Sequence, residues 1–230
     1  MVRRIQLAPR VLALGLVSGS AHATLIGRDL NGSAGSFEAY YDTDLNLTWL
    51  ANANVNGLMS WADANTWTTN LSFTDGVHVY SNWRLPATLQ PDASCGSQSG
   101  DSYSFGYGCT GSEMGHLFYS ELGGTALQSI LTSSDSDLAM FTNLQSTTYW
   151  SGTEFPSTTS AAWTFDFGNG CDGSGGFQRT QRKDRRCGSA LAVRSGDIAA
   201  VPGPNGIPEP QTLALVGLGF LGLAVARRRG

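Results

Sequence analysis

The sequence predicts an α+β fold for a single domain in the middle of the chain, and three observations indicate this class. Two segments before residue 123 have apolar residues at helical spacing. Short alternating stretches typical of strands flank them and dominate after residue 147. Several of these stretches carry tryptophan or phenylalanine, which suits strands that face a core. Residues 24–200 are long enough for one hydrophobic core and too short for two ordinary domains.

The first 23 residues are interpreted as a secretory signal peptide. Basic residues come first, an apolar run at residues 11–17 follows, and Ala21 and Ala23 form an A-x-A cleavage site. A membrane-spanning helix needs about 20 apolar residues, so this run is too short to be an anchor. We therefore expect signal peptidase to act on the chain and the mature protein to begin at Thr24.

The first elements of the domain are a hairpin and a helix. Residues 37–50 have the pattern of two strands joined by a turn at residues 42–44, where aspartates favour a turn. Residues 60–71 predict a helix, because Ser60 is a candidate N-cap and Asp63 follows three residues later. Residues 82–86 follow as a compact turn, and the Gly/Ser-rich stretch 90–110 predicts an inserted loop.

The remaining elements are one helix and three strands. The spacing of apolar residues predicts a helix over 112–122, which ends at Gly123. Strands are expected at 147–151, 161–168 and 190–194. In the second of these, aromatic and polar residues alternate, so we expect a half-buried strand with its polar face toward solvent.

The C-terminus shows a three-part pattern. Pro208-Glu209-Pro210 precedes an apolar segment at 213–226, and the chain then ends in an arginine cluster. The cluster consists of Arg227, Arg228 and Arg229. This pattern resembles the PEP-CTERM sorting tail of Gram-negative bacteria that produce exopolysaccharide.

The resemblance implies an order of events at the membrane. Residues 201–210 would be a Pro/Gly linker, and residues 211–230 would hold a single transmembrane helix with the arginines on the cytoplasmic side. An exosortase, a membrane enzyme similar to a transpeptidase, would then cut near the Pro-Glu-Pro. The expected localisation is therefore export through the inner membrane, transient anchoring, and then the cell surface or the extracellular space.

A second resemblance covers roughly residues 42–194 and is carried by motifs in a fixed order. The motifs are Asp44 with Trp49-Leu50, Trp83-Arg84-Leu85-Pro86, Tyr149-Trp150-Ser151-Gly152-Thr153, Ala162-Trp163-x-Phe165 and Ala192-Val193-Arg194. This order resembles the Lcl C-terminal domain family. The resemblance implies a fold similar to C-type lectins and formylglycine-generating enzymes, and the family includes a glycan-binding adhesin domain. The cysteine-bearing insertion before residue 112 departs from the commoner pattern.

Four cysteines lie in the exported domain, where an oxidising periplasm would pair them. Three connectivities are possible. We favour Cys95 with Cys109 and Cys171 with Cys187, because each pair closes a short Gly/Ser-rich loop. Each closure would stabilise the fold by about 3 kcal/mol in the loop-entropy model. Zinc binding is the alternative, but the chain has no C-x-x-C pair.

The charges argue against nucleic acid as a partner. Six of the 14 basic residues lie in the two ends, whereas only one of the 18 acidic residues does. The domain is therefore acidic and is repelled by phosphate backbones. Its one basic cluster could bind an anionic polysaccharide, or its members could pair with acids such as Asp184 in a solvated hairpin. The cluster consists of Arg179, Arg182, Lys183, Arg185 and Arg186.

No catalytic residue and no metal ligand is assigned. The segment 172–176 departs from the nucleophile loop of trypsin-like enzymes by an extra glycine, and no acid, base and nucleophile converge in sequence. Asp42-x-Asp44-x-Asn46 has the spacing of a calcium loop but lacks its glycine, so a turn cap is favoured and calcium stays an option. We expect a non-enzymatic surface or biofilm-matrix protein; the alternatives are a lectin-like adhesin module that binds exopolysaccharide and a secreted hydrolase.

Overall fold

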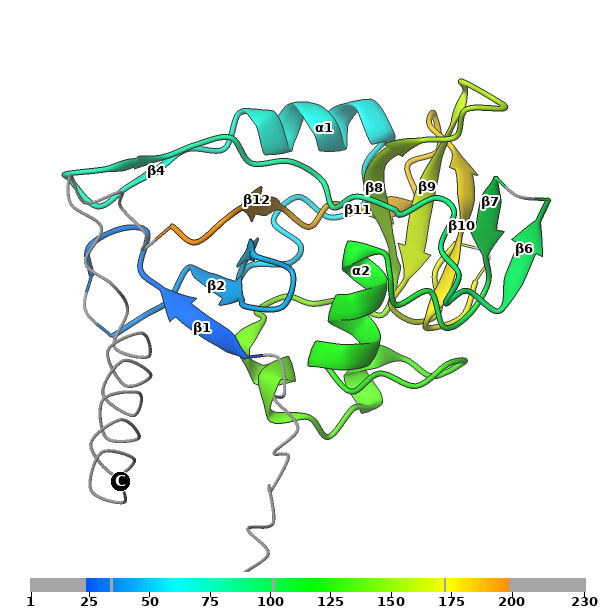
Figure 1. The fold of residues 1–230 in the computed structure, drawn as a ribbon. Coiled ribbons are helices and arrows are strands. Elements are labelled where there is room, and N and C mark those ends of the chain that lie inside the picture. Colours follow the sequence, from blue (N-terminus) through cyan, green and yellow to red (C-terminus); the bar gives the residue numbers. More distant parts are fainter. Residues whose placement is uncertain (1–23, 34, 101, 172, 199–230) are drawn as a thin grey trace, which may run out of the picture.

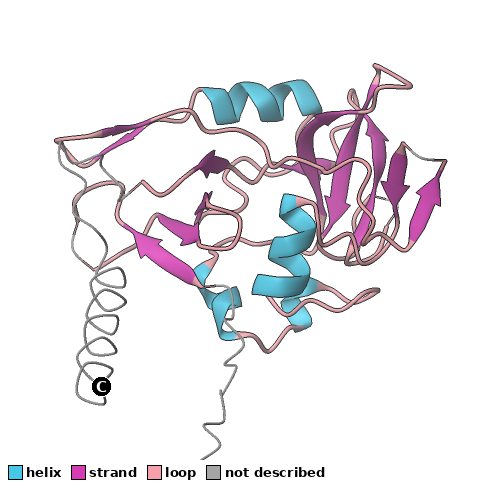
Figure 2. Cartoon of the chain, in the orientation of Figure 1, coloured by secondary structure: helices cyan, strands magenta, loops and turns pink. Residues whose placement is uncertain are grey.

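The computed structural model describes residues 24–33, 35–100, 102–171 and 173–198 (Figure 1). The signal peptide with Ala21 and Ala23, the linker and the sorting tail lie outside these residues. The described part contains mixed sheets and few helices, which confirms the predicted α+β class (Figure 2). None of the helices in this part is long and apolar enough to cross a membrane.

The first four-stranded sheet joins the start of the domain to its end. Its order is β1-β2-β3-β12, and all neighbours are antiparallel. The predicted hairpin at 37–50 is confirmed as β2 and β3, and Asn46 at their turn has φ of 51°. The strands are β1 (Leu25–Arg28), β2 (Ala39–Asp42), β3 (Leu47–Leu50) and β12 (Val193–Ser195).

The second four-stranded sheet has the order β10-β9-β8-β11. Strands β10, β9 and β8 are antiparallel, whereas β11 pairs with β8 in parallel. The strands are β8 (Thr148–Glu154), β9 (Ala161–Asp166), β10 (Phe177–Arg182) and β11 (Gly188–Ser189). In Figure 1 this sheet lies at the right, next to the hairpin of the insertion.

Strand β9 corrects one expectation. Its polar face was expected to meet solvent, but Thr164 and Asp166 are fully buried along with the aromatic residues. The Asp166 carboxylate accepts a hydrogen bond from the Thr148 hydroxyl and lies 3.1 Å from Nε of Arg179. The strand is therefore buried on both faces, and Asp166 has a hydrogen bond and an ion pair in this interior.

The predicted insertion loop contains a hairpin that docks on the second sheet. Gly106, directly after β7, exchanges two backbone hydrogen bonds of 2.9 Å with Gln178 of β10. The hairpin thereby covers the edge of the sheet that β10 would otherwise expose. The short strands of the fold are β4 (Phe73–Thr74), β5 (Val79–Tyr80), β6 (Ser97–Ser99) and β7 (Tyr103–Phe105).

Both predicted helices form. In α1 (Trp61–Thr69), the Ser60 hydroxyl accepts a hydrogen bond from the Asp63 amide at 3.2 Å, as the N-cap prediction required. The second begins as α2 (Glu113–His116), continues as a π-helical turn η1 (Leu117–Glu121), and stops at Gly123, whose φ is 60°. Two short 3₁₀ turns, η2 (Ile130–Thr132) and η3 (Ser136–Met140), were not predicted.

The core lies between the helix of residues 113–121 and the two sheets. Its largest cluster packs Met114 and Phe118 against aromatic residues of both sheets. Four of the six tryptophans are 2 % exposed or less, namely Trp49, Trp83, Trp150 and Trp163. Three of these indoles donate hydrogen bonds, to Asp42, to the Tyr80 carbonyl and to the Met59 carbonyl. The tryptophans are thus mainly core residues.

Candidate functional site

The structure distributes the predicted basic cluster over several ion pairs. Arg179 is largely buried on β10 beside Asp166, so little of its side chain is exposed. Lys183 Nζ lies 2.8 Å from the Glu154 carboxylate and 4.3 Å from the centre of the Trp61 ring. An anionic ligand would have to displace these partners to reach the two cations.

The other members of the cluster stay at the surface. Arg182 donates to the Asp184 carboxylate at 2.6 Å, and this arginine lowers the pKa of Asp184. Arg186 lies 3.5 Å from Asp63, and Arg185 donates to the Gln181 side chain at 3.3 Å. Such exposed pairs contribute little to stability, so these arginines can exchange partners. Three members of the cluster thus lie at the surface, and Arg182 and Arg186 pair with carboxylates there.

One of the two predicted disulfides is confirmed by the structure. Cys95 and Cys109 form a disulfide. Cys171 and Cys187 do not, and this half of the prediction is wrong: the Cys171 thiol donates instead to the carbonyl oxygen of Cys187 at 2.7 Å. The two backbones are close because Cys187 precedes β11 and the Cys171 amide donates to Thr148 of the neighbouring β8. The Cys171 sulfur, however, is directed at the main chain.

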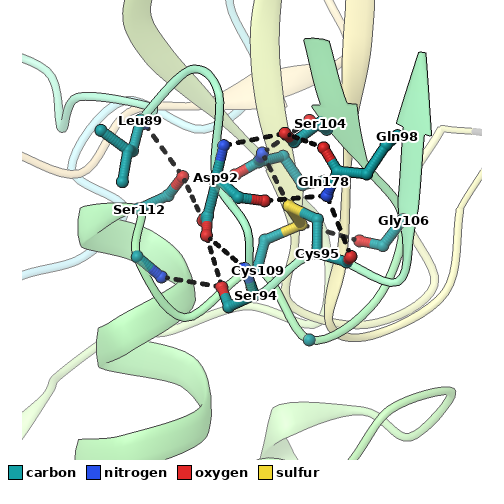
Figure 3. The surroundings of a disulfide bond; sticks show 12 residues. Leu89, Asp92, Ser94, Cys95, Gln98, Ser104, Gly106, Cys109, Ser112 and Gln178 are labelled. Atoms are coloured by element: carbon teal, nitrogen blue, oxygen red, sulfur yellow. Dashed lines mark hydrogen bonds between the residues drawn. A yellow bond between two sulfur atoms is a disulfide. The ribbon is translucent and has the colours of Figure 1, made fainter. Parts of the chain in front are cut away.

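A buried polar network surrounds the disulfide (Figure 3). Asp92 is 2 % exposed; its amide donates to the Ser104 hydroxyl at 2.8 Å, and its carboxylate accepts from the Ser94 amide. Gln178 of β10 donates to the Ser104 carbonyl at 3.1 Å. The disulfide and this network hold the β6–β7 hairpin in a fixed position against the second sheet.

A cleft of about 270 Å³ lies between this hairpin and the second sheet. Tyr103 and Phe105 come from β7, Trp163 from β9, and Phe155 from the segment that follows β8. The rings of Tyr103 and Phe155 lie 4.9 Å apart, and those of Phe155 and Trp163 lie 5.7 Å apart. The lining residues are Ser99, Tyr103, Phe105, Phe155, Trp163, Arg179 and Thr180.

The chemistry of the cleft is that of a binding surface for a small, partly apolar group. Four of its lining residues are aromatic, and Ser99 and Thr180 also line it. The Trp163 indole nitrogen is buried and has no hydrogen-bond partner among the described residues. Arg179 adds one cation whose charge Asp166 offsets. Aromatic walls with a few polar groups are typical of small-molecule sites.

Side chains that could hold a metal meet at two places in the described part of the chain. Asp92, Cys95 and Cys109 are close together, but the disulfide occupies both sulfurs. Asp42, His116 and Glu121 form the other group, with one ligand atom of each within 4.8 Å of the others.

The three side chains of this second group also make contacts with their own surroundings. Asp42 Oδ1 accepts from the amides of Asp44 and Leu45 at 3.0 Å, so the predicted turn cap is confirmed. Glu113, three residues before His116 on α2, pairs with Arg84 at 2.7 Å. His116 Nε2 lies 2.9 Å from Glu121 Oε1, and this hydrogen bond raises the pKa of His116 although burial opposes it.

Comparison with known proteins identifies the C-terminal tail. Residues 206–229 match the PEP-CTERM protein-sorting motif, which confirms the predicted sorting tail. No curated protein and no solved structure matches the chain. The motif indicates export, transient anchoring in the membrane, an exosortase as the processing partner, and a final location at the surface.

Proposed function

We propose that this exosortase-sorted surface protein is a non-enzymatic component of the extracellular matrix, and that its domain binds a polysaccharide chain through the aromatic cleft. The observation that carries the proposal is the cleft itself, in which the Phe155 ring contacts the rings of both Tyr103 and Trp163, and Ser99 and Thr180 are among the lining residues. A sugar ring has one face of C–H groups that packs on aromatic rings and an edge of hydroxyls that form hydrogen bonds.

Two further observations support a sugar over an anion or a reacting substrate. Arg179 is the charged residue of the cleft wall, and Asp166 offsets its charge at 3.1 Å, so a neutral sugar unit fits better than a free anion. The described lining residues include no carboxylate, histidine or thiol that could act as a general acid or base. The volume of about 270 Å³ suits one sugar residue of a longer chain.

The resemblance of residues 42–194 to the Lcl C-terminal domain family supports the same proposal, because that family includes a glycan-binding adhesin domain. A C-type-lectin-like arrangement is part of this proposal. The chain departs from the commoner pattern of the family at the insertion, and the insertion supplies Tyr103 and Phe105 to the cleft. The ligand preference would therefore differ from that of relatives without it.

The test is binding of the full chain to a glycan array that holds neutral and uronic-acid-containing polysaccharides. The double variant Tyr103→Ala/Phe155→Ala is expected to weaken binding of the best glycan by at least tenfold, because aromatic contacts at such a site contribute about 1 kcal/mol or more each. Phe37→Ala serves as the matched control, since its ring is 55 % exposed and lies outside the cleft. This variant should bind as the wild type does.

A second double variant separates the cleft from the basic surface. Arg182→Gln/Arg185→Gln removes two exposed cations and leaves the cleft intact. Loss of binding in this variant alone would move the site to the basic hairpin and contradict the proposal for the cleft. Absence of binding to every glycan would leave a matrix protein without a lectin activity.

A further inference from the structure

The π-helical turn η1 changes which residues of its helix share a face. In a regular α-helix, residues five apart are separated by about 500° of rotation, so their side chains point about 140° apart. In η1 the Leu122 amide bonds to the Leu117 carbonyl at 3.0 Å, which is the wider i to i+5 pattern. This turn brings Glu121 back beneath His116, and their side chains meet at 2.9 Å. Single π turns inside α-helices frequently occur at functional sites.

A third side chain arrives from the first sheet. Asp42 ends β2, is fully buried, and has a ligand atom within 4.8 Å of those of His116 and Glu121. Its Oδ1 accepts two backbone hydrogen bonds and its Oδ2 accepts one from the Trp49 indole. A carboxylate has about four acceptor positions, so Asp42 is held rigidly and retains one position for a ligand.

The Glu121 carboxylate indicates that this group of side chains lacks a ligand. Its side chain is 1 % exposed, and its Oε2 atom has no hydrogen-bond partner among the described residues, while Oε1 bonds to His116. A buried carboxylate oxygen without a partner is costly. Two buried carboxylates beside a single imidazole also leave an excess of negative charge, which a divalent cation would cancel.

We propose that Asp42, His116 and Glu121 bind a divalent transition-metal ion, with zinc as the best fit. Imidazole and carboxylate ligands together suit zinc, whereas calcium takes six to eight oxygen atoms. Tetrahedral zinc ligands lie about 3.4 Å apart, so a rotation of His116 and Glu121 closes the group around the ion. His116 is 15 % exposed and provides the path from solvent. Three protein ligands leave a fourth position for water or another small ligand.

The site would also link two parts of the fold. Asp42 belongs to the first sheet, and the other two ligands belong to the helix of residues 113–121. An ion that binds only the folded chain stabilises it by mass action, so saturation with zinc raises the melting temperature.

The experiment is a calorimetric titration of Zn²⁺ into the full chain, purified in detergent without a histidine tag and stripped with EDTA. We expect one ion per chain and a higher melting temperature. His116→Gln and Glu121→Gln should each weaken binding by about tenfold or more. His78→Gln is the matched control, because His78 also pairs with a carboxylate, Asp75, but lies in a different hairpin. The proposal would be overturned if the wild-type chain showed no saturable binding, or if both site variants bound Zn²⁺ with the affinity of the wild type.

X-ray absorption of the zinc-loaded wild-type chain tests the site without relying on a variant that could fail to fold. Nitrogen and oxygen ligands at about 2.0–2.2 Å are expected. A sulfur ligand at about 2.3 Å would place the ion on a cysteine and contradict the assignment.

Discussion

At the scale of single residues, Asp75 shows how one carboxylate organises a turn. It lies between β4 and β5 and accepts hydrogen bonds from the His78 amide, the Tyr80 hydroxyl and the Val77 amide. These bonds hold the pKa of Asp75 well below its usual range, the His78 amide contributing most. The hydrogen bond to Asp75 is in turn the main cause that raises the pKa of Tyr80 to about 12. The ionised carboxylate is thus the form that the folded chain prefers.

Asp75 therefore makes stability depend on pH. Its pKa is lower in the folded chain than in the unfolded one, so its contribution is complete above the unfolded pKa, near 4, and is lost as pH falls toward the folded value. Asp75→Asn should lower the melting temperature at pH 7, and this deficit should shrink between pH 5 and pH 2. Thermal melts across this range measure it. A deficit that stays constant with pH would mean that the charge of Asp75 is not its cause.

At the scale of elements, the insertion and the second helix are built against each other. A Cβ atom on Gly115 of α2 would lie 1.7 Å from the Cys109 carbonyl oxygen, so only glycine allows the helix to approach the disulfide loop this closely. The disulfide fixes that loop, and the loop carries the hairpin that forms one wall of the cleft. The position of the cleft wall and the packing of α2 therefore both depend on the loop that the Cys95–Cys109 disulfide closes.

Removal of the disulfide tests this dependence. Cys95→Ser/Cys109→Ser opens a loop with a sequence separation of 14 and should lower the free energy of unfolding by about 3 kcal/mol. Chemical denaturation measures the loss. The pair Cys171→Ser/Cys187→Ser is the matched control and should cost much less, because in the structure these residues are joined by a thiol-to-carbonyl hydrogen bond rather than by a disulfide. An equal loss in both variants would show that the second disulfide forms after all.

At the scale of the whole molecule, the sorting tail makes a prediction about mass. In a host with an exosortase, the recovered protein should lack the residues before Thr24 and those after Pro208-Glu209-Pro210. Mass spectrometry of the intact protein measures both losses at once. The same host without its exosortase is the control and should yield a chain that keeps Arg227, Arg228 and Arg229. An intact tail in both hosts would mean that the domain stays tethered to the membrane.

Features that depend on residues close together in the chain could be predicted from the amino-acid sequence. The Ser60 cap, the turn at Asp42 and the helix stop at Gly123 each involve hydrogen bonds or backbone angles within a few positions. The Pro-Glu-Pro tail is likewise a linear signal. The α+β class follows from the same local patterns, because helical and strand spacing differ within one turn.

Features that join distant segments could not be predicted in this way, because they depend on how the chain folds in three dimensions. The cleft combines residues from 99 to 180, and the group of Asp42, His116 and Glu121 needs both a sheet contact and the shifted register of a π turn. The two-sided burial of β9 and the hydrogen bond from Cys171 likewise depend on which strands become neighbours. Hydrophobic periodicity shows that a face is buried but does not encode its partner, so the chemistry of this domain appears only once the chain has folded.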